Sequence, residues 1–143
     1  MIDAPVIIKR VMPCSKRQLF DAWSKPEVMS AWFFADQMAR KPSTVKNSFT
    51  VGGHWELTMH LHESDPCMHG EYREINRYNR IVFTWNSHIA NDSIVELDFR
   101  EISPNRTEMK LTHTHFPSEE SRASHINGWD MCLDSLAQYL DEG

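Results

Sequence analysis

Four side chains of the types that bind zinc stand on either side of one short turn in the middle of the chain. His60 and His62 are two residues apart, as are Cys67 and His69, and Asp65-Pro66 lies between the two pairs. Residues at i and i+2 share one face of a β-strand, and cysteine with histidine is a common zinc ligand set. The alternative is that the histidines lie on a solvated strand face, because they alternate with apolar residues. We favour this alternative and expect no metal.

Carboxylates and imidazoles on the same strands could instead serve as general bases. The candidates are Glu56, Glu71, Glu74 and the histidines, with His113 and His115 straddling Thr114 near the last helix. Strand alternation places Glu56 on an exposed face, and a hydrogen-bonded structural role is the commoner outcome for an interior histidine. The sequence has no nucleophile elbow, HExxH motif or phosphate-binding glycine loop, and Gly52-Gly53 is typical of a hairpin turn. Catalysis stays open but is the less favoured interpretation.

One dense aromatic cluster, Trp32-Phe33-Phe34, is suited to binding rather than to chemistry. If Phe34 faced outward, the cluster would form part of a homodimer contact. The interpretation that we favour is that all three rings close one end of an internal hollow.

The elements that position these groups follow from hydrophobic periodicity and from helix-capping residues. Residues 6–12 are rich in β-branched side chains and predict a first strand. Ser15-Lys16-Arg17-Gln18 is a capping box that begins a helix, and Ser24-Lys25-Pro26-Glu27 repeats the capping pattern before a second short helix. Residues 39–48 have no clear period, which predicts a loop, with a short edge strand at 48–51.

The rest of the chain predicts a run of antiparallel strands and then a long helix. Alternation of apolar and polar residues indicates strands at 54–62, 81–85 and 95–99, with a polar loop at 86–92. The turns at Asp65-Pro66 and Pro104-Asn105 lead into two further strands, at 68–75 and 107–115. Ser118 is placed to cap a final helix. The apolar face expected for that helix consists of Ile126, Trp129, Cys132, Leu133, Leu136 and Leu140.

This order of elements predicts an α+β fold in which a curved antiparallel sheet of six to seven strands wraps around the C-terminal helix. We expect residues 1–143 to form a single domain, because 143 residues with 41% hydrophobic content can bury a core without disulfides or metal.

Composition and charge exclude several function classes. The net charge is −5 and the 15 Lys and Arg residues are scattered, so nucleic acid is not an expected partner. The widely spaced Cys14, Cys67 and Cys132 and the lack of an apolar leader after Met1 favour the cytoplasm. No apolar stretch has the length of a membrane span.

Several segments also carry a family resemblance. These are Phe20-Asp21-Ala22-Trp23, Pro26-Glu27, Ala31-Trp32, Gly52-Gly53-His54-Trp55, Gly70-Glu71-Tyr72, Glu74-Ile75, Arg80-Ile81-Val82-Phe83-Thr84-Trp85, Leu111-Thr112-His113, Gly128-Trp129 and Cys132-Leu133. Through them nearly the whole chain resembles the family of the C-terminal domain of the heat-shock protein 90 ATPase activator, within the START-like (SRPBCC) superfamily. The resemblance implies the helix-grip fold of lipid-transfer domains, pollen-allergen-like proteins and polyketide cyclases.

The same resemblance bears on partners. The eukaryotic activator also has an N-terminal chaperone-binding domain with an Asn-rich, Trp-containing motif. These 143 residues contain no such motif, so a chaperone is not the partner that we expect.

A long helix across a concave sheet predicts an apolar cavity between the two. The candidate lining residues are Trp32, Phe33, Trp55, Leu57, Met59, Tyr72, Phe83, Trp85, Phe99, Met109 and Trp129. Each of them could also be plain core. We expect the domain to bind a small hydrophobic or lipid-like molecule, with no cofactor. The alternatives are a protein-interaction or chaperone-associated module and a cyclase- or hydrolase-like enzyme.

Overall fold

The structure, a computed structural model that describes residues 4–33 and 39–142, consists of one antiparallel sheet and three helices. The elements in chain order are β1 (Val6–Met12), α1 (Lys16–Ala22), α2 (Pro26–Trp32), β2 (Ala39–Asn47), β3 (His54–Leu61), β4 (Cys67–Asn76), β5 (Arg80–Ser87), β6 (Ala90–Ser103), β7 (Arg106–Thr114) and α3 (Glu119–Glu142). The predicted α+β fold is confirmed, and the sheet has seven strands.

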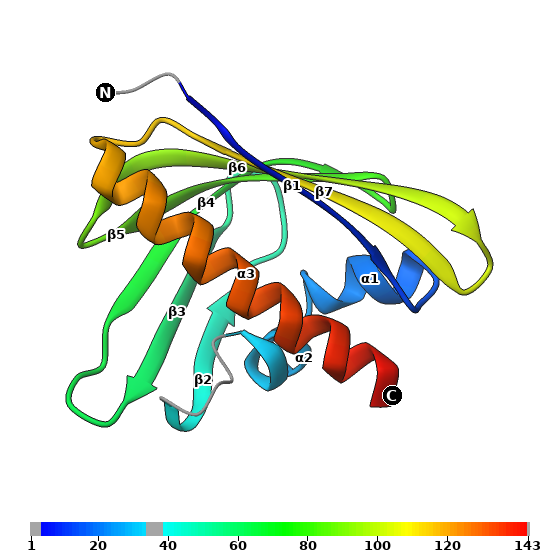
Figure 1. Cartoon of the computed structure of the whole chain (residues 1–143), viewed down its shortest axis with the longest axis horizontal. Helices are drawn as coiled ribbons and strands as arrows, with labels where there is room; N and C mark the ends of the chain where they lie inside the picture. The colour runs from blue at the N-terminus through cyan, green and yellow to red at the C-terminus, as the bar shows by residue number, and fades with distance from the viewer. Residues whose placement is uncertain (1–3, 34–38, 143) are drawn as a thin grey trace.

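The sheet curls around the long helix. Its strand order is β1-β7-β6-β5-β4-β3-β2, so β2 to β7 form a meander and β1 is added beside β7, with Val6 opposite His113. Figure 1 shows α3 lying diagonally across the concave side, with α1 and α2 near the C-terminal end of α3. The helix is thus gripped by the sheet, as the sequence predicted.

The two short helices begin in different ways. The Ser15 hydroxyl accepts a hydrogen bond from the Gln18 backbone N–H at 3.1 Å, and the Gln18 side chain accepts from the Ser15 N–H at 3.0 Å, so the capping box of α1 is confirmed. The predicted Ser24 cap is wrong. The N-cap of α2 is Lys25, which makes no side-chain capping bond, because Pro26 with its fixed φ already occupies the first helical position.

Replacing Ser15 by alanine is expected to lower the free energy of unfolding by about 1 kcal/mol, since it leaves an N–H of the first turn of α1 without its acceptor. Urea denaturation followed by circular dichroism measures the loss. Ser64→Ala is the matched control, because Ser64 is exposed and lies outside any helix, and its effect should stay within about 0.5 kcal/mol. Equal losses in the two variants would contradict the assignment of the cap.

The face of α3 that points into the sheet is longer than the apolar pattern indicated. Ser118 caps the helix as predicted, its hydroxyl accepting from the Ser121 N–H at 3.1 Å. The buried positions of α3 are Ser121, His125, Trp129, Cys132, Leu133 and Leu136, whereas Ile126 and Leu140 are half-buried. The first two buried turns of α3 are therefore polar, which hydrophobic periodicity does not detect.

Two predicted loop regions are strands instead. Residues 39–47 form β2, with register shifts between Lys41 and Thr44, and residues 48–51 form no strand. Ser43 of β2 is buried and donates a hydrogen bond to the Phe33 carbonyl at 2.9 Å, so an inward-facing position is polar and the strand pattern is broken. The expected hairpin turn is present before β3, where Gly52 has a φ of 86°.

The predicted loop at 86–92 is likewise wrong, because β5 continues to Ser87 and β6 begins at Ala90. The polar side chains here serve the sheet itself. The Asn86 side-chain oxygen accepts from the Asp92 N–H at 2.7 Å, and the fully buried Ser93 donates to the Trp85 carbonyl at 2.6 Å.

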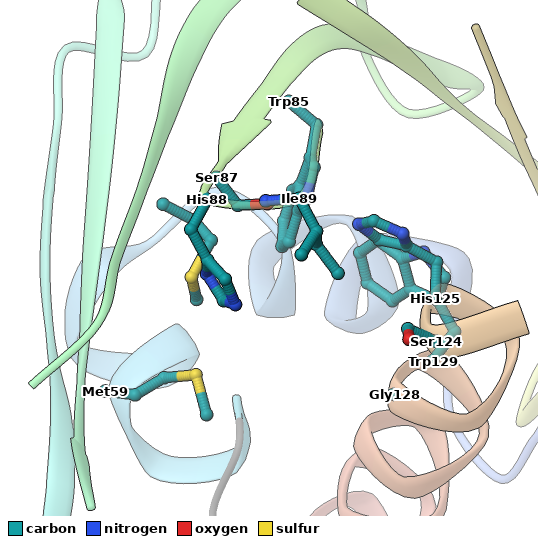
Figure 2. Close-up of a pocket in the computed structure, with 10 residues that line it drawn as sticks. Met59, Trp85, Ser87, His88, Ile89, Ser124, His125, Gly128 and Trp129 are labelled. Atoms are coloured by element: carbon teal, nitrogen blue, oxygen red, sulfur yellow. The ribbon is translucent and has the colours of Figure 1, made fainter. Parts of the chain in front are cut away.

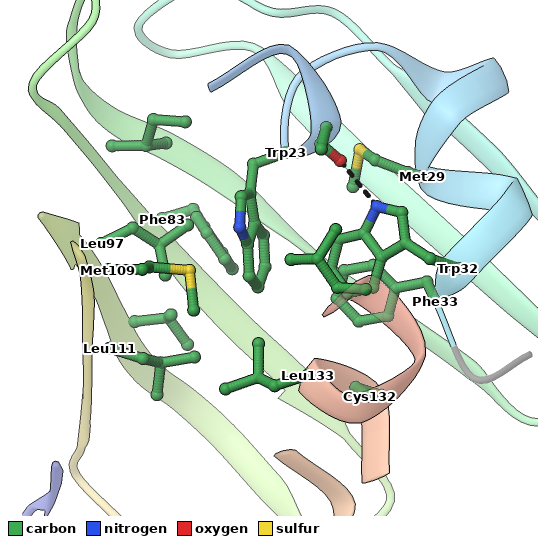
Figure 3. Packing of buried hydrophobic residues seen from close by; sticks show 14 of the residues in the cluster. Trp23, Met29, Trp32, Phe33, Phe83, Leu97, Met109, Leu111, Cys132 and Leu133 are labelled. Atoms are coloured by element: carbon green, nitrogen blue, oxygen red, sulfur yellow. Dashed lines mark hydrogen bonds between the residues drawn. The ribbon is translucent and has the colours of Figure 1, made fainter. Parts of the chain in front are cut away.

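Aromatic rings from α1, α2 and the sheet fill much of the space under the C-terminal half of α3 (Figure 3). Trp32 is fully buried, and its indole N–H donates to the Ala22 carbonyl at 2.8 Å. In the sheet, a Cβ at Gly70 would lie 1.8 Å from the Thr84 carbonyl oxygen, so only glycine fits there. That close approach lets the Trp55 indole N–H donate to the same carbonyl at 3.1 Å.

Candidate functional site

The predicted lining residues all gather in the space between the sheet and α3. Ten of them are buried, and Met59 is half-buried against the same cluster. The rings of Trp32 and Phe33 stack with centroids 4.4 Å apart, and Trp23 meets Trp32 edge-on at 4.8 Å. Such contacts are those of a packed core. Whether these residues touch a ligand stays a prediction.

Around the middle of this cluster only a narrow gap is left. Its volume is about 10 Å³, which is close to the minimum for a single water molecule. The gap is lined by Trp23, Met29, Phe33, Trp55, Leu57, Tyr72, Phe83 and Trp85. Of the predicted residues, Trp32, Phe99 and Met109 line neither this gap nor the larger pocket described next, and are core.

A larger pocket lies between the N-terminal half of α3 and the end of β5. Its volume is about 150 Å³. We call it the α3 pocket, and it is lined by Met59, Met68, Trp85, Ser87, His88, Ile89, Ser124, His125, Gly128 and Trp129. Figure 2 shows residues of α3 on one side, residues at the end of β5 on another, and Met59 reaching toward the helix from β3. Three predicted residues, Met59, Trp85 and Trp129, line this pocket.

A hydrogen-bonded chain beside the pocket holds His113 in one defined tautomer. The Trp129 indole N–H can only donate, so Nδ1 of His113 accepts it, at 3.0 Å, and carries no proton. The imidazole proton is therefore on Nε2, which donates to the Ser93 hydroxyl at 2.8 Å. Burial, with a smaller effect from His125, lowers the pKa of His113 from 6.5 to about 2. His113 is the structural interior histidine that the sequence favoured, while His115 is exposed.

His125 is the polar side chain of the pocket that sequence patterns missed. It lies one turn before Trp129 on the same face of α3, and its Nδ1 is 2.7 Å from the Ser121 carbonyl oxygen. Burial lowers the pKa of His125 below 6.5, opposed by the bond to Ser121 and assisted by the nearby His88. The spacing of Ser121, His125 and Trp129 at i, i+4 and i+8 was the available signal.

The indole N–H groups of Trp23 and Trp85 are unusual because neither has a hydrogen-bond partner among the described residues. The side chains of Trp23 and Trp85 are buried, and the Nε1 atom of each lacks an acceptor. Buried indole donors usually find an acceptor, so each is an exception that calls for a structural reason. Other atoms of Trp85 line both the narrow gap and the α3 pocket, whereas its Nε1 atom is enclosed by protein.

The four candidate zinc ligands are not brought together. His60 is buried rather than solvated as we expected, and its two ring nitrogens contact Thr44 Oγ1 at 2.7 Å and Asp65 Oδ2 at 3.2 Å. His62, Cys67 and His69 are exposed. Within residues 4–33 and 39–142, no three His, Cys, Asp or Glu side chains form a group suited to a metal.

The Asp65, His60 and Thr44 side chains follow the order of acid, base and hydroxyl in a catalytic triad. None of the three lines either the α3 pocket or the narrow gap, and Thr44 is exposed on edge strand β2. In this position the hydrogen bonds join β2 to the turn between β3 and β4.

The candidate carboxylates also lie away from the α3 pocket. Glu71 pairs with Arg73 and Glu74 with Arg80, each at 3.2 Å, and the exposed Glu56 accepts a weak hydrogen bond from Cys67. Of the aromatic trio, Trp32 and Phe33 are buried in the core, whereas Phe34, on which the dimer interpretation depended, lies outside the described residues.

The sheet, the gripped helix and the pocket between them define a START-like domain of the helix-grip type. The chain belongs to the family described as Activator of Hsp90 ATPase homolog 1-like protein, whose model matches residues 13–141. The family resemblance seen in the sequence is therefore confirmed.

Solved structures share the fold along nearly the whole chain. An uncharacterized protein from Rhizobium leguminosarum superposes with a TM-score of 0.83 at 20% identity, covering 99% of this chain and 97% of its own. A protein from Chromobacterium violaceum gives 0.79 at 17% identity, covering 95% and 96%. An HSP90 activator from Plasmodium falciparum gives 0.75 at 24% identity, covering 96% of each chain. No curated protein matches the sequence.

Among the described helices, none combines the length and the apolar character needed to cross a membrane.

Proposed function

We propose that this protein binds a small, largely apolar molecule in the α3 pocket. The observation that carries the proposal is the pocket itself, about 150 Å³ in volume and lined mainly by Trp, Met and Ile side chains. A cavity of about this volume in a protein core can hold a molecule of the size of benzene. Ligand sites are typically apolar with a few polar groups that fix orientation, and His125, His88 and two serines supply such groups here.

The α3 pocket also differs from the rest of the interior in a way that supports binding. Under the other half of α3, aromatic rings fill the space and leave a gap of about 10 Å³. Next to Trp129, however, α3 carries Gly128 instead of a large side chain. A Cβ at Gly128 would have no heavy atom within 4 Å, so the glycine leaves open the space that a ligand would use.

Filling this space from Gly128 is expected to abolish binding. Leucine at position 128 would extend into the pocket, so Gly128→Leu should remove the rise in melting temperature that benzene causes in the wild-type protein. Differential scanning fluorimetry near the solubility limit of benzene, with isothermal titration calorimetry for the affinity, measures both proteins.

Two matched variants separate pocket filling from effects on the helix. Asn127→Leu places the same side chain at the exposed neighbouring position and should keep wild-type binding. Gly128→Ala should raise the free energy of unfolding by about 0.5–1 kcal/mol through helix propensity alone. The proposal fails if benzene leaves the wild-type melting temperature unchanged, or if Gly128→Leu binds benzene as well as Asn127→Leu does.

A hydrolase- or cyclase-like activity is the second candidate, and His125 is the observation that favours it. A buried imidazole with a lowered pKa at a pocket is typical of an active site. No Asp, Glu or Cys is among the ten lining residues, so His125 has no acidic partner or thiol nucleophile there. The chaperone-associated alternative draws on the name of the P. falciparum activator, and no contact within the described residues favours it over ligand binding.

A further inference from the structure

The α3 pocket contains one hydrogen-bond acceptor whose protonation state follows from its neighbour. Nδ1 of His125 lies 2.7 Å from the Ser121 carbonyl oxygen, which can only accept, so Nδ1 carries the proton and donates. In the neutral imidazole, Nε2 is then the unprotonated nitrogen. It has no hydrogen-bond partner among the described residues, although the ring is buried and lines the pocket. Nε2 is accessible from the pocket, because the only described side-chain N and O atoms that are both buried and without a partner are the indole nitrogens of Trp23 and Trp85.

The charges around His125 exclude an anion as its natural partner. None of the ten lining residues is a lysine or an arginine. The titratable groups that face His125 are His113 from β7, with ring centroids 4.8 Å apart, and His88 from the turn between β5 and β6. Burial and His88 both lower the pKa of His125, so the ring is neutral at pH 7.5 and presents a lone pair. A carboxylate would be desolvated there without a Lys or Arg to balance its charge.

We propose, as an extension of the proposed function, that the ligand of the α3 pocket is a neutral ring molecule with a hydroxyl group, of which phenol is the simplest. The hydroxyl donates its hydrogen bond to Nε2 of His125, and the ring lies among Trp85, Trp129 and the methionines. A ring of this size suits a pocket of about 150 Å³, and methionine sulfur makes favourable contacts with aromatic edges.

Trp85 borders the pocket but does not present its indole donor to a ligand. Its indole N–H is a buried donor without a partner, and its ring centroid lies 6.3 Å from that of His125. Because Nε1 of Trp85 is enclosed by protein, the hydroxyl of the ligand is assigned to Nε2 of His125 alone. A ketone has no proton to donate to Nε2, and an amine cation would find no carboxylate among the lining residues.

The test compares phenol, benzene and benzoate on the wild-type protein at pH 7.5 by isothermal titration calorimetry. Phenol is expected to bind up to about tenfold more tightly than benzene, because its hydroxyl donates a hydrogen bond to Nε2 of His125. Benzoate is expected to bind more weakly than either. Equal affinity for phenol and benzene would overturn the hydroxyl assignment while leaving the proposed function intact. Binding of neither would overturn both.

A variant and a spectroscopic signal identify the acceptor. In His125→Phe, phenol and benzene should bind within about threefold of each other, since the ring stays apolar and the acceptor is gone. On wild-type protein labelled with ¹⁵N, phenol should shift the Nε2 resonance of His125 and benzene should not, a readout that does not depend on the variant folding. An unmoved Nε2 resonance at saturating phenol would refute the contact.

Lowering the pH supplies a third comparison. Once the pH falls below the folded pKa of His125, which is less than 6.5, Nε2 gains a proton and becomes a donor. The preference for phenol over benzene should then shrink, and benzoate binding should strengthen. A preference that does not change down to the onset of acid unfolding would contradict the role of the neutral ring.

Discussion

Trp32→Ala is expected to lower the free energy of unfolding by about 3–5 kcal/mol, a large share of the total for a domain of this size. Trp32 is fully buried at the end of α2 and contacts both Trp23 and Phe33 through its ring. Removing the Trp32 ring leaves a cavity between the neighbouring rings, which cannot move far enough to fill it. The Ala22 carbonyl also loses the indole N–H that donates to it.

Urea denaturation at pH 7.5, followed by circular dichroism, measures this loss. Trp32→Phe is the matched variant that keeps a ring and removes the hydrogen bond, and it should cost clearly less than the alanine variant. Ile102→Ala is the surface control, since 43% of the Ile102 surface is exposed, and should cost less than about 0.5 kcal/mol. A loss below about 1 kcal/mol for Trp32→Ala would contradict this expectation, because it would mean that the neighbouring side chains move in and fill the new cavity.

Acidification should destabilise the protein through His113. Burial lowers the pKa of His113 from its ordinary value of 6.5 to about 2 in the folded protein, so the unfolded chain binds an additional proton between these two pH values. Stability contributed by the neutral, buried ring is complete above pH 6.5 and is lost as the pH falls below it. Below pH 6.5 the free energy of unfolding should fall by about 1.4 kcal/mol per pH unit. The total loss between pH 7.5 and 4.5 should be about 2–3 kcal/mol.

The free energy of unfolding as a function of pH checks this expectation. His113→Gln should be less stable at pH 7.5, because Trp129 and Ser93 lose their shared partner, but its dependence on pH should be shallower by about one proton. His69→Gln, at an exposed position, should retain the wild-type dependence on pH. An unchanged slope in His113→Gln would mean that other groups cause the acid sensitivity. His125, whose pKa is also lowered, acts in the same direction.

The sequence predicted the sheet and the long helix well, because both depend on which side of an element is apolar. Trp55 and Leu57 of β3 are buried as their spacing indicated, and so are Trp129, Leu133 and Leu136 of α3. Hydrophobic periodicity did not predict β2, where Ser43 faces inward and the register shifts. Hydrophobic periodicity assumes regular pairing and apolar interiors, and this edge strand has neither.

The α3 pocket could be predicted only in part. A concave sheet under a helix implied an internal space. Hydrophobic periodicity, however, does not show which parts of that space the bulky aromatic rings fill. Trp32 and Phe33 turned out to pack closely together, while the open volume lies beside Gly128 and His125. A glycine and a histidine on a helix face carry little hydrophobic signal, so periodicity could not locate this pocket.

The position of β1 has a consequence for how the chain folds. Among the described strands β1 comes first along the chain, yet it pairs with β7, the last of them, and with no other. During translation β1 therefore has an unpaired edge until nearly all of the sequence has left the ribosome, and the pairing must close a loop that includes most of the chain. The meander from β2 to β7 can form from neighbouring hairpins, so we expect docking of β1, with its half-exposed Ile7 and Val11, to be a late and slow step.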